Sequence, residues 1–267
     1  MGSDLIFDTE TTGLPRRGWA PEDPRVPHVV QLAAVLVKHE NDAWHEEAAL
    51  DAILAWEGLE VPLPATRIHG ISTERMRAKG RAPLLVMQEF DALVRRAGRI
   101  ISFNLEFDEA VILAAYHRAG GTGAAYRKLE RVCVMQSARP VCKLPAKNGG
   151  YKTPSLAEAH RALTGTEFDG AHTAMGDARA CYAIARELTH QGAPLGYTPP
   201  PATPVVDVDL VWLDTVLKAV DEELGKLTDW ENSFMADFTA RREKYGAATT
   251  ISDRQRAVLE RIWEKVR

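Results

Sequence analysis

Two acidic residues lie within an apolar segment near the amino terminus, and they limit how this chain can fold. Residues 5–10 read LIFDTE, whose alternation and β-branched residues predict a β-strand. Side chains alternate along a strand, so Asp8 and Glu10 share one face and Thr9 points to the other. Burying two unpaired carboxylates side by side is costly. Either this is an edge strand with both acids in water, or a cation holds the pair, and divalent cations prefer such oxygen ligands.

The order of the segments predicts an α/β fold. Strand-like runs occur at 5–10, 29–37, 44–56 and 99–104. Helical periodicity marks residues 84–96, 105–120, 155–165 and 173–192. Residues 121–154, which contain glycine and proline, are expected to be rich in loops. Early strands followed by alternating helices and one more strand predict a mixed sheet flanked by helices.

Proline concentrates in one segment and predicts a division of the chain. Residues 193–204 contain five of the fifteen prolines, which is typical of a semi-rigid linker. Beyond it, apolar residues recur at three-to-four spacing in three helical patterns. We therefore expect a main domain over residues 1–190, a proline-rich linker over 191–206 and a helical C-terminal region over 207–267.

Composition agrees with a cytoplasmic globular protein. The chain is 45% hydrophobic and 26% charged, both ordinary values. Its three cysteines lack CxxC spacing, which argues against a disulfide framework or a zinc site. Neither a signal peptide nor an apolar run long enough for a membrane span is visible, so no membrane association is expected.

Two further acids and a histidine extend the acidic pair. Asp108 lies in the first turn of the predicted helix 105–120, after a strand, where open α/β sheets place ligands. Asp177 follows His172 by five residues, and on one helix their side chains would point about 140° apart. We therefore expect the helix to begin near Gly176, with His172 on the preceding loop, available as a base. Taken alone, Asp108 could instead complement the helix dipole, and His172 could be a core or surface residue.

The net charge of −4 does not by itself indicate a nucleic-acid binder, but basic residues are concentrated in one segment. Seven of them lie between residues 127 and 152, against the single acid Glu130: Arg127, Lys128, Arg131, Arg139, Lys143, Lys147 and Lys152. Such a run is usually a solvated surface. The alternative is a strip that faces phosphates.

Three segments of the sequence resemble, in order, the motifs of the DEDDh (DnaQ-like) 3′–5′ exonuclease family. They are FDTETTGL, SFNLEFDEAVI and HTAMGDARACYAI, and RIHGIS resembles a further segment of the family. The family includes the epsilon subunit of bacterial DNA polymerase III and exonuclease X. The resemblance covers about residues 3–190 and implies a ribonuclease-H-like fold, to which the C-terminal helices are an appendage. Phe103 is a departure, because many relatives have His or Tyr before the asparagine.

The resemblance also implies a metal-dependent site. It assigns two divalent ions, Mg²⁺ or Mn²⁺, to the carboxylates of Asp8, Glu10, Asp108 and Asp177. Asp8 would bridge both ions, Glu10 and Asp177 would bind the ion that carries the attacking water, and Asp108 would bind the other ion. His172 would be the general base. Substrate contacts are expected from Thr9, Thr11, Thr12, Gly13, Leu14, His69, Phe103, Asn104, Lys143, Lys147 and Lys152.

The implied activity is release of nucleoside monophosphates from the 3′ end of single-stranded or frayed DNA. An RNA exonuclease similar to ribonuclease T or oligoribonuclease is the first alternative, because the motifs do not separate DNA from RNA. A non-catalytic nucleic-acid-binding scaffold of the same fold is the second, although such proteins typically lose one acid and all are present here. Residues 207–267 are expected to pack on the catalytic domain, to bind a replication or recombination protein, or to form a dimer contact.

Overall fold

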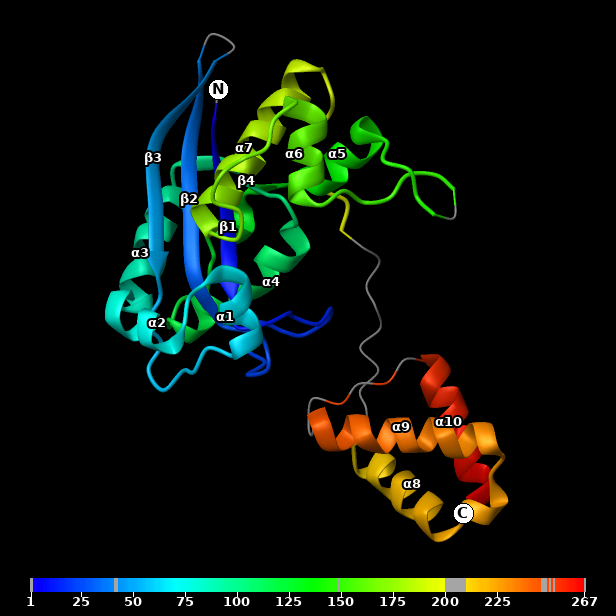
Figure 1. Ribbon diagram of the computed structural model, residues 1–267. Coiled ribbons are helices and arrows are strands. Elements are labelled where there is room, and N and C mark those ends of the chain that lie inside the picture. The colour runs from blue at the N-terminus through cyan, green and yellow to red at the C-terminus, as the bar shows by residue number, and fades with distance from the viewer. Residues whose placement is uncertain are drawn as a thin grey trace. The chain divides into compact units, whose positions relative to one another are not determined.

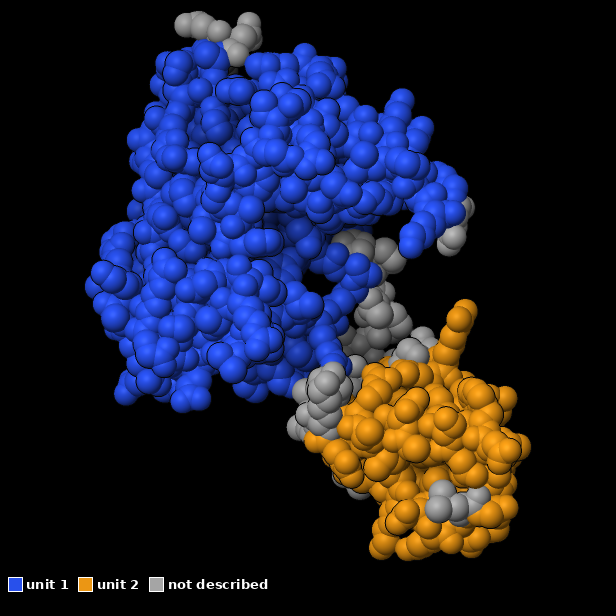
Figure 2. Space-filling model, viewed as in Figure 1, with its two compact units in different colours: residues 1–201 blue, residues 202–267 orange. Residues whose placement is uncertain are grey.

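The computed structural model describes residues 2–40, 43–147, 149–199, 210–245, 249, 251 and 253–266. The chain divides into two compact units, residues 1–201 and residues 202–267 (Figures 1 and 2). The first unit contains a β-sheet with helices on both faces, and the second contains helices.

Five strands form a single mixed sheet in the first unit, in the order β3-β2-β1-β4-β5. They are β1 (Ser3–Thr11), β2 (Val29–Glu40), β3 (Ala43–Ile53), β4 (Ala97–Ser102) and β5 (Glu130–Cys133). β1 pairs antiparallel with β2 and parallel with β4, so it lies in the middle of the sheet. The prediction of a mixed α/β sheet is confirmed. β5 and the helix after it lie in the segment expected to be loops, so that expectation was wrong; a strand of four residues is too short to show a clear period.

Helices cover both faces of this sheet (Figure 1). The helices of the first unit are α1 (Leu63–His69), α2 (Thr73–Lys79), α3 (Pro83–Val94), α4 (Leu105–Arg118), the short η1 (Tyr126–Lys128), α5 (Val134–Cys142), α6 (Leu156–Thr164) and α7 (Ala174–His190). Core residues of α3 and α4 pack with Leu5 and Phe7 of β1, whereas those of α5, α6 and α7 pack with Ile6. Because side chains alternate, Asp8 and Glu10 continue the face of Ile6, and Thr9 continues the other face.

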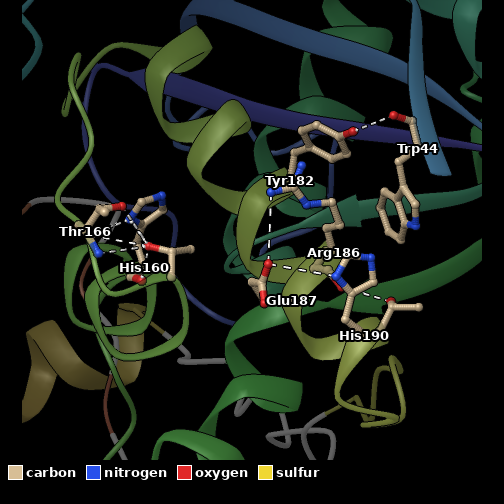
Figure 3. A network of polar contacts seen from close by, with 10 residues as sticks. Trp44, His160, Thr166, Tyr182, Arg186, Glu187 and His190 are labelled. Atoms are coloured by element: carbon tan, nitrogen blue, oxygen red, sulfur yellow. Dashed lines mark hydrogen bonds and ion pairs between the residues drawn. The ribbon is translucent and has the colours of Figure 1, made fainter. Parts of the chain in front are cut away.

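The long helix α7 is tied to the sheet by a polar contact and carries further polar contacts along its own length (Figure 3). The Tyr182 hydroxyl donates to the backbone carbonyl of Trp44 in β3 at 3.1 Å. Farther along α7, Glu187 lies 4.0 Å from Arg186 and 3.9 Å from His190. The Tyr182 contact holds α7, whose first turn carries Asp177, against β3.

The first part of the proline-rich segment is attached to the first unit. Backbone N–H of Cys133 donates to the carbonyl of Gly196 at 3.0 Å, and the Gln136 side chain exchanges two hydrogen bonds with the backbone of Thr198. Residues 193–199 therefore dock beside β5 and α5. The remainder of the predicted linker, 200–206, lies outside the described residues.

The second unit contains the predicted C-terminal helices. They are α8 (Leu210–Glu222), η2 (Leu224–Lys226), α9 (Asp229–Tyr245) and α10 (Asp253–Val266). Leu213, Phe238 and Ile262 contribute to a core of their own, and Thr228 with Glu231 forms a capping box before α9. In the described ranges of both units, no helix has the length and apolar character needed to cross a membrane.

Candidate active site

Three carboxylates converge at the carboxyl end of β1. Asp8 and Glu10 come from the strand, and Asp177 comes from the first turn of α7, which packs over the same face. Each offers an oxygen atom, and these atoms all lie within 4.8 Å of one another. Oδ1 of Asp177 is buried and has no hydrogen-bond partner among the described residues. A set of clustered carboxylate oxygens with an unsatisfied member matches the ligands that Mg²⁺ and Mn²⁺ prefer.

Asp108 reaches the same end of the sheet from α4, but hydroxyl groups hold it. Its Oδ1 accepts a hydrogen bond from Thr9 Oγ1 at 2.7 Å, and its Oδ2 accepts one from the hydroxyl of Ser102. All three residues are buried. Thr9 thus connects β1 to α4 on the face opposite to Asp8 and Glu10. Sequence reasoning did not single out Ser102; the signal was a polar residue at the end of an otherwise apolar strand.

The environment raises the pKa of all four acids. Burial raises the pKa of Asp8 well above its ordinary value, and the charges of Asp108, Asp177 and Glu10 raise it further. Burial, followed by repulsion from Asp177 and Asp108, raises the pKa of Glu10 to about 7. Burial likewise raises the pKa values of Asp108 and Asp177 to about 6 each. The free energy of ionising these groups together is high, and a bound divalent cation would offset it.

His172 lies on the loop that precedes α7, and a contact between two glycines shapes this loop. Thr173 is the N-cap of α7: its hydroxyl donates to the Gly170 carbonyl at 2.6 Å and accepts from the Gly176 N–H at 3.2 Å. A Cβ atom on Gly176 would lie 2.2 Å from the Gly170 carbonyl oxygen, so no larger residue fits. His172 itself has a positive φ of 64°, uncommon outside glycine. The helix begins at Ala174, two residues before the expected start, and His172 remains outside it.

A cavity of about 600 Å³ opens over the carboxylates and also reaches His172. It is lined by every one of the non-basic residues expected to contact substrate: Thr9, Thr11, Thr12, Gly13, Leu14, His69, Phe103 and Asn104. Two apolar side chains on its rim are exposed to solvent, Leu14 at 81% and Ile68 at 60%. Ile68, which belongs to α1, was missed by sequence reasoning. Phe107 and Leu156 were missed as well. Ile68 and Phe107 lie inside the motifs RIHGIS and SFNLEFDEAVI but were not singled out there, and Leu156 lies outside the quoted motifs.

Some polar side chains around the cavity make hydrogen bonds within the protein, and others make none. Thr11 Oγ1 donates to the Gly13 carbonyl at 2.6 Å, and Thr12 Oγ1 accepts from the His28 N–H at 3.0 Å, so both hydroxyls stabilise the turn. The Asn104 side chain makes no capping hydrogen bond, although the residue precedes α4. His69 accepts from the Ile71 N–H through Nδ1, which leaves the proton on Nε2.

Nε2 of His69 is buried and has no hydrogen-bond partner among the residues that the structure describes. Burial lowers the pKa of His69, so its ring is neutral at pH 7. The cavity is therefore lined by the ring of His69, next to the Thr11 backbone, and by an Asn104 side chain that makes no capping hydrogen bond.

The basic segment does not form one continuous strip. Arg131 lies on β5, where it pairs with Glu109 at 2.6 Å. Lys143, Lys147 and Lys152 lie in the connection between α5 and α6, and none of the three lines the cavity. The structure thus separates the predicted basic residues into two groups.

Comparison with known proteins agrees with this geometry. The sequence profile of the RNase T exonuclease family matches residues 5–185, a range that contains all four acids and His172. Comparison with curated proteins gives no match by sequence. Similar solved structures include *E. coli* exonuclease I with a dT13 oligonucleotide, 19% identical, with a TM-score of 0.57 over 86% of this chain and 46% of that chain.

The same enzyme with a dA16 oligonucleotide is 19% identical, with a TM-score of 0.54 over 71% of this chain and 41% of that chain. The present chain thus spans less than half the length of these structures. At this level of identity the similarity concerns the fold, and the ribonuclease-H-like fold expected from the sequence is confirmed.

Proposed function

The chain belongs to the DnaQ-like exonuclease family that its motifs predicted, and on this premise we propose that it is a metal-dependent 3′–5′ exonuclease. Its substrate is proposed to be single-stranded or frayed DNA, from which it releases nucleoside monophosphates. The observation that carries the proposal is the cavity that joins Asp8, Glu10 and Asp177 to His172. The oligonucleotides dA16 and dT13 bound to *E. coli* exonuclease I support single-stranded DNA as the substrate.

The four acids are proposed to hold two divalent cations, Mg²⁺ or Mn²⁺. Asp8, Glu10 and Asp177 fit one ion through their clustered oxygens, and Asp108 is assigned to the second. When bound, such ions neutralise the carboxylates, lower the pKa of a water molecule and stabilise negative charge on the phosphate. The raised pKa values of the four acids support this assignment, because the ionised cluster is costly without a cation.

His172 is proposed as the general base. An imidazole nitrogen of its ring accepts the proton of the attacking water, next to Asp177. The side chain is exposed at the edge of the cavity, so the proton passes directly to solvent after each reaction. The Gly170–Gly176 contact supports this role, because it determines where the loop presents the ring.

The 3′-terminal nucleotide is proposed to occupy the cavity. Leu14 and Ile68 offer apolar surface to its base. This surface accepts any of the bases, because every base has an apolar face. The ring of His69 and the amide of Asn104 are proposed to supply hydrogen bonds to its polar atoms. Outside the cavity, Lys143 and Lys147 are proposed to contact phosphates of the preceding nucleotides, whereas Lys152 pairs with Glu158.

End-labelled oligonucleotides test the proposal directly. Matched DNA and RNA strands, labelled at the 5′ end, are incubated with Mg²⁺ or Mn²⁺ and resolved by length. The expected result is stepwise shortening of DNA from the 3′ end, which stops when a chelator removes the metal. Faster degradation of RNA would assign the ribonuclease alternative. Undiminished activity of purified Asp8→Ala would overturn the site itself.

The helical region 207–267 contributes none of these site residues. We propose that it binds a replication or recombination protein, and the separate core of the second unit supports an independent role. Truncation after residue 201 keeps the docked segment 193–199. It is expected to retain hydrolysis of short oligonucleotides and to lose association with the partner in pull-down experiments. Loss of hydrolysis in a folded truncation would instead assign these helices to catalysis.

A further inference from the structure

The connection between α5 and α6 is a hairpin that projects from the body of the first unit (Figure 1). Its two sides are joined by hydrogen bonds from the Lys152 N–H to the Leu144 carbonyl at 2.9 Å and from the Ala146 N–H to the Gly150 carbonyl at 3.0 Å. Gly149 and Gly150 both have positive φ, as the reversal of the chain requires. We refer to residues 143–147 and 149–152 as the basic hairpin.

Side chains fasten the base of the basic hairpin to the helices on either side. The guanidinium of Arg139 in α5 donates two hydrogen bonds to the Tyr151 carbonyl, at 3.1 and 2.9 Å. The ammonium of Lys152 pairs with Glu158 in α6. Arg139 and Lys152 are therefore engaged within the protein, and their contacts give the hairpin a defined direction.

Other groups of the basic hairpin are available to a ligand. No acidic residue occurs between Arg131 and Glu158, so the hairpin has no negative charge of its own. In the described part of the chain, no ion pair joins Lys143 or Lys147 to another residue. The aromatic side chain of Tyr151 is 46% exposed. An aromatic ring between cations is the combination that binds single strands, because the ring stacks on a base while the cations meet phosphates.

The basic hairpin is also close to the cavity along the chain. Leu156, the first residue of α6, lines the cavity, and it follows Lys152 by four residues. Four residues span at most about 14 Å. A strand whose 3′ end occupies the cavity and that leaves it past Leu156 comes within reach of the hairpin.

We propose that the basic hairpin is a second contact surface for the single-stranded substrate. Tyr151 stacks on a base upstream of the 3′-terminal nucleotide, and Lys143 and Lys147 contact the phosphates beside it. The proposal rests on the exonuclease function proposed above. It adds Tyr151 to the residues that contact substrate, and the contacts of Arg139 and Lys152 fix the base of the hairpin on which Tyr151 lies. It predicts that the enzyme prefers strands long enough to reach from the cavity to the hairpin.

A length series of oligonucleotides tests this surface. The ratio of kcat/KM for a strand of about twelve nucleotides to that for a dinucleotide is measured for wild type, Tyr151→Ala and Tyr151→Phe. Tyr151→Ala is expected to lower this ratio about tenfold, because it removes one stacked base. Tyr151→Phe keeps the ring and is expected to keep the ratio. Equal ratios in wild type and Tyr151→Ala would overturn the proposal.

The lysines are tested through salt dependence. Lys143→Gln with Lys147→Gln is expected to reduce the slope of log binding affinity against log salt concentration, measured by fluorescence anisotropy with a dT oligonucleotide. Lys38→Gln, at the opposite end of the sheet beside Ser3, is the matched control and should keep the slope. An unchanged slope in the double variant would remove both lysines from the surface.

These experiments distinguish the surface from the activity it serves. If wild type degrades DNA and Tyr151→Ala shows the same length dependence, the hairpin contact is refuted and the exonuclease proposal stands. Absence of hydrolysis in wild type with either metal would refute the exonuclease proposal. In that case, binding by Tyr151→Ala relative to Tyr151→Phe still decides whether the hairpin holds single strands.

Discussion

One end of β1 carries the buried Asp4 and the other carries the partly buried Asp8, and the chain supplies a positive partner for only one of the two charges. Asp4, 2% exposed, accepts hydrogen bonds from Arg99 at 2.8 and 2.6 Å and lies 2.7 Å from His39. Asp8, four residues later, is surrounded by other acids, and no cation of the described chain pairs with it. A charge satisfied by the chain itself stabilises the fold, whereas a charge left unsatisfied requires a partner from outside.

Replacing Asp8 is expected to have the largest effect. Asp8→Asn removes a ligand from the centre of the cluster, and hydrolysis should fall by about 10³-fold or more. The same change removes a repulsive charge, so the free energy of unfolding without metal should stay equal or rise. Oligonucleotide hydrolysis and chemical denaturation measure the two quantities. A lower free energy of unfolding for the metal-free variant would show that Asp8 stabilises the fold as Asp4 does, and would contradict the contrast drawn between them.

Breaking the pair at the other end should affect stability instead. Arg99→Leu leaves Asp4 without its bidentate partner and should lower the free energy of unfolding by about 3 kcal/mol. Arg96→Leu is the matched control, because its contact with Glu47 is exposed and should matter by less than about 1 kcal/mol. Activity per folded molecule should be unchanged in both variants. A specific loss of kcat in Arg99→Leu would assign this end to catalysis.

Displacing His172 tests whether catalysis depends on the position of its loop beside the carboxylates of β1 and α7. In Gly176→Ala, the new Cβ meets the Gly170 carbonyl, moves the loop and is expected to lower kcat by about 10²-fold. Gly225→Ala, where a Cβ atom meets nothing within 4 Å, is the control and should retain activity. Full activity of Gly176→Ala would show that the position of the loop is unimportant.

Without metal, the free energy of unfolding should depend on pH through the acids at the carboxyl end of β1. The pKa values of Glu10, about 7, and Asp177, about 6, lie above those of unfolded acids near 4. Between about pH 4 and pH 7 the folded state therefore binds more protons, and these groups make the free energy of unfolding fall as pH rises. Saturating Mg²⁺ should reverse this loss, so the Mg²⁺-induced rise in Tm should be larger at about pH 8 than at about pH 5.

The control for this measurement is Asp8→Asn with Glu10→Gln, in which the Mg²⁺-induced shift should largely disappear. A shift of the same size at both pH values would contradict the assignment of these acids as the metal site. The full Mg²⁺-induced rise in Tm in the double variant would also contradict this assignment.

The smallest effect is expected where a hydroxyl orients one acid. Thr9→Val removes the hydrogen bond to Asp108 without changing the size of the side chain, and activity should fall about tenfold. Thr9→Ser keeps the hydroxyl and should restore most of the rate. Equal rates for Thr9→Val and wild type would show that Ser102 alone holds Asp108.

The sequence by itself determined the features that depend on local spacing. The two-residue period of LIFDTE placed Asp8 and Glu10 on one face, and the five-residue spacing from His172 to Asp177 separated the loop from the helix. The three motifs identified the family and the residues that meet at the cavity. These conclusions hold because strand and helix periods relate near neighbours in the chain, whatever surrounds them.

The tertiary structure alone decided which distant groups meet. It joined Thr9 to Asp108 across 99 residues, brought Ile68 of α1 to the rim of the cavity and separated Arg131 from the basic hairpin. It also revealed β5, which is a strand because it pairs with β4. Such contacts depend on strand order and helix packing, which no local period encodes, so the details of the site became visible only with the fold.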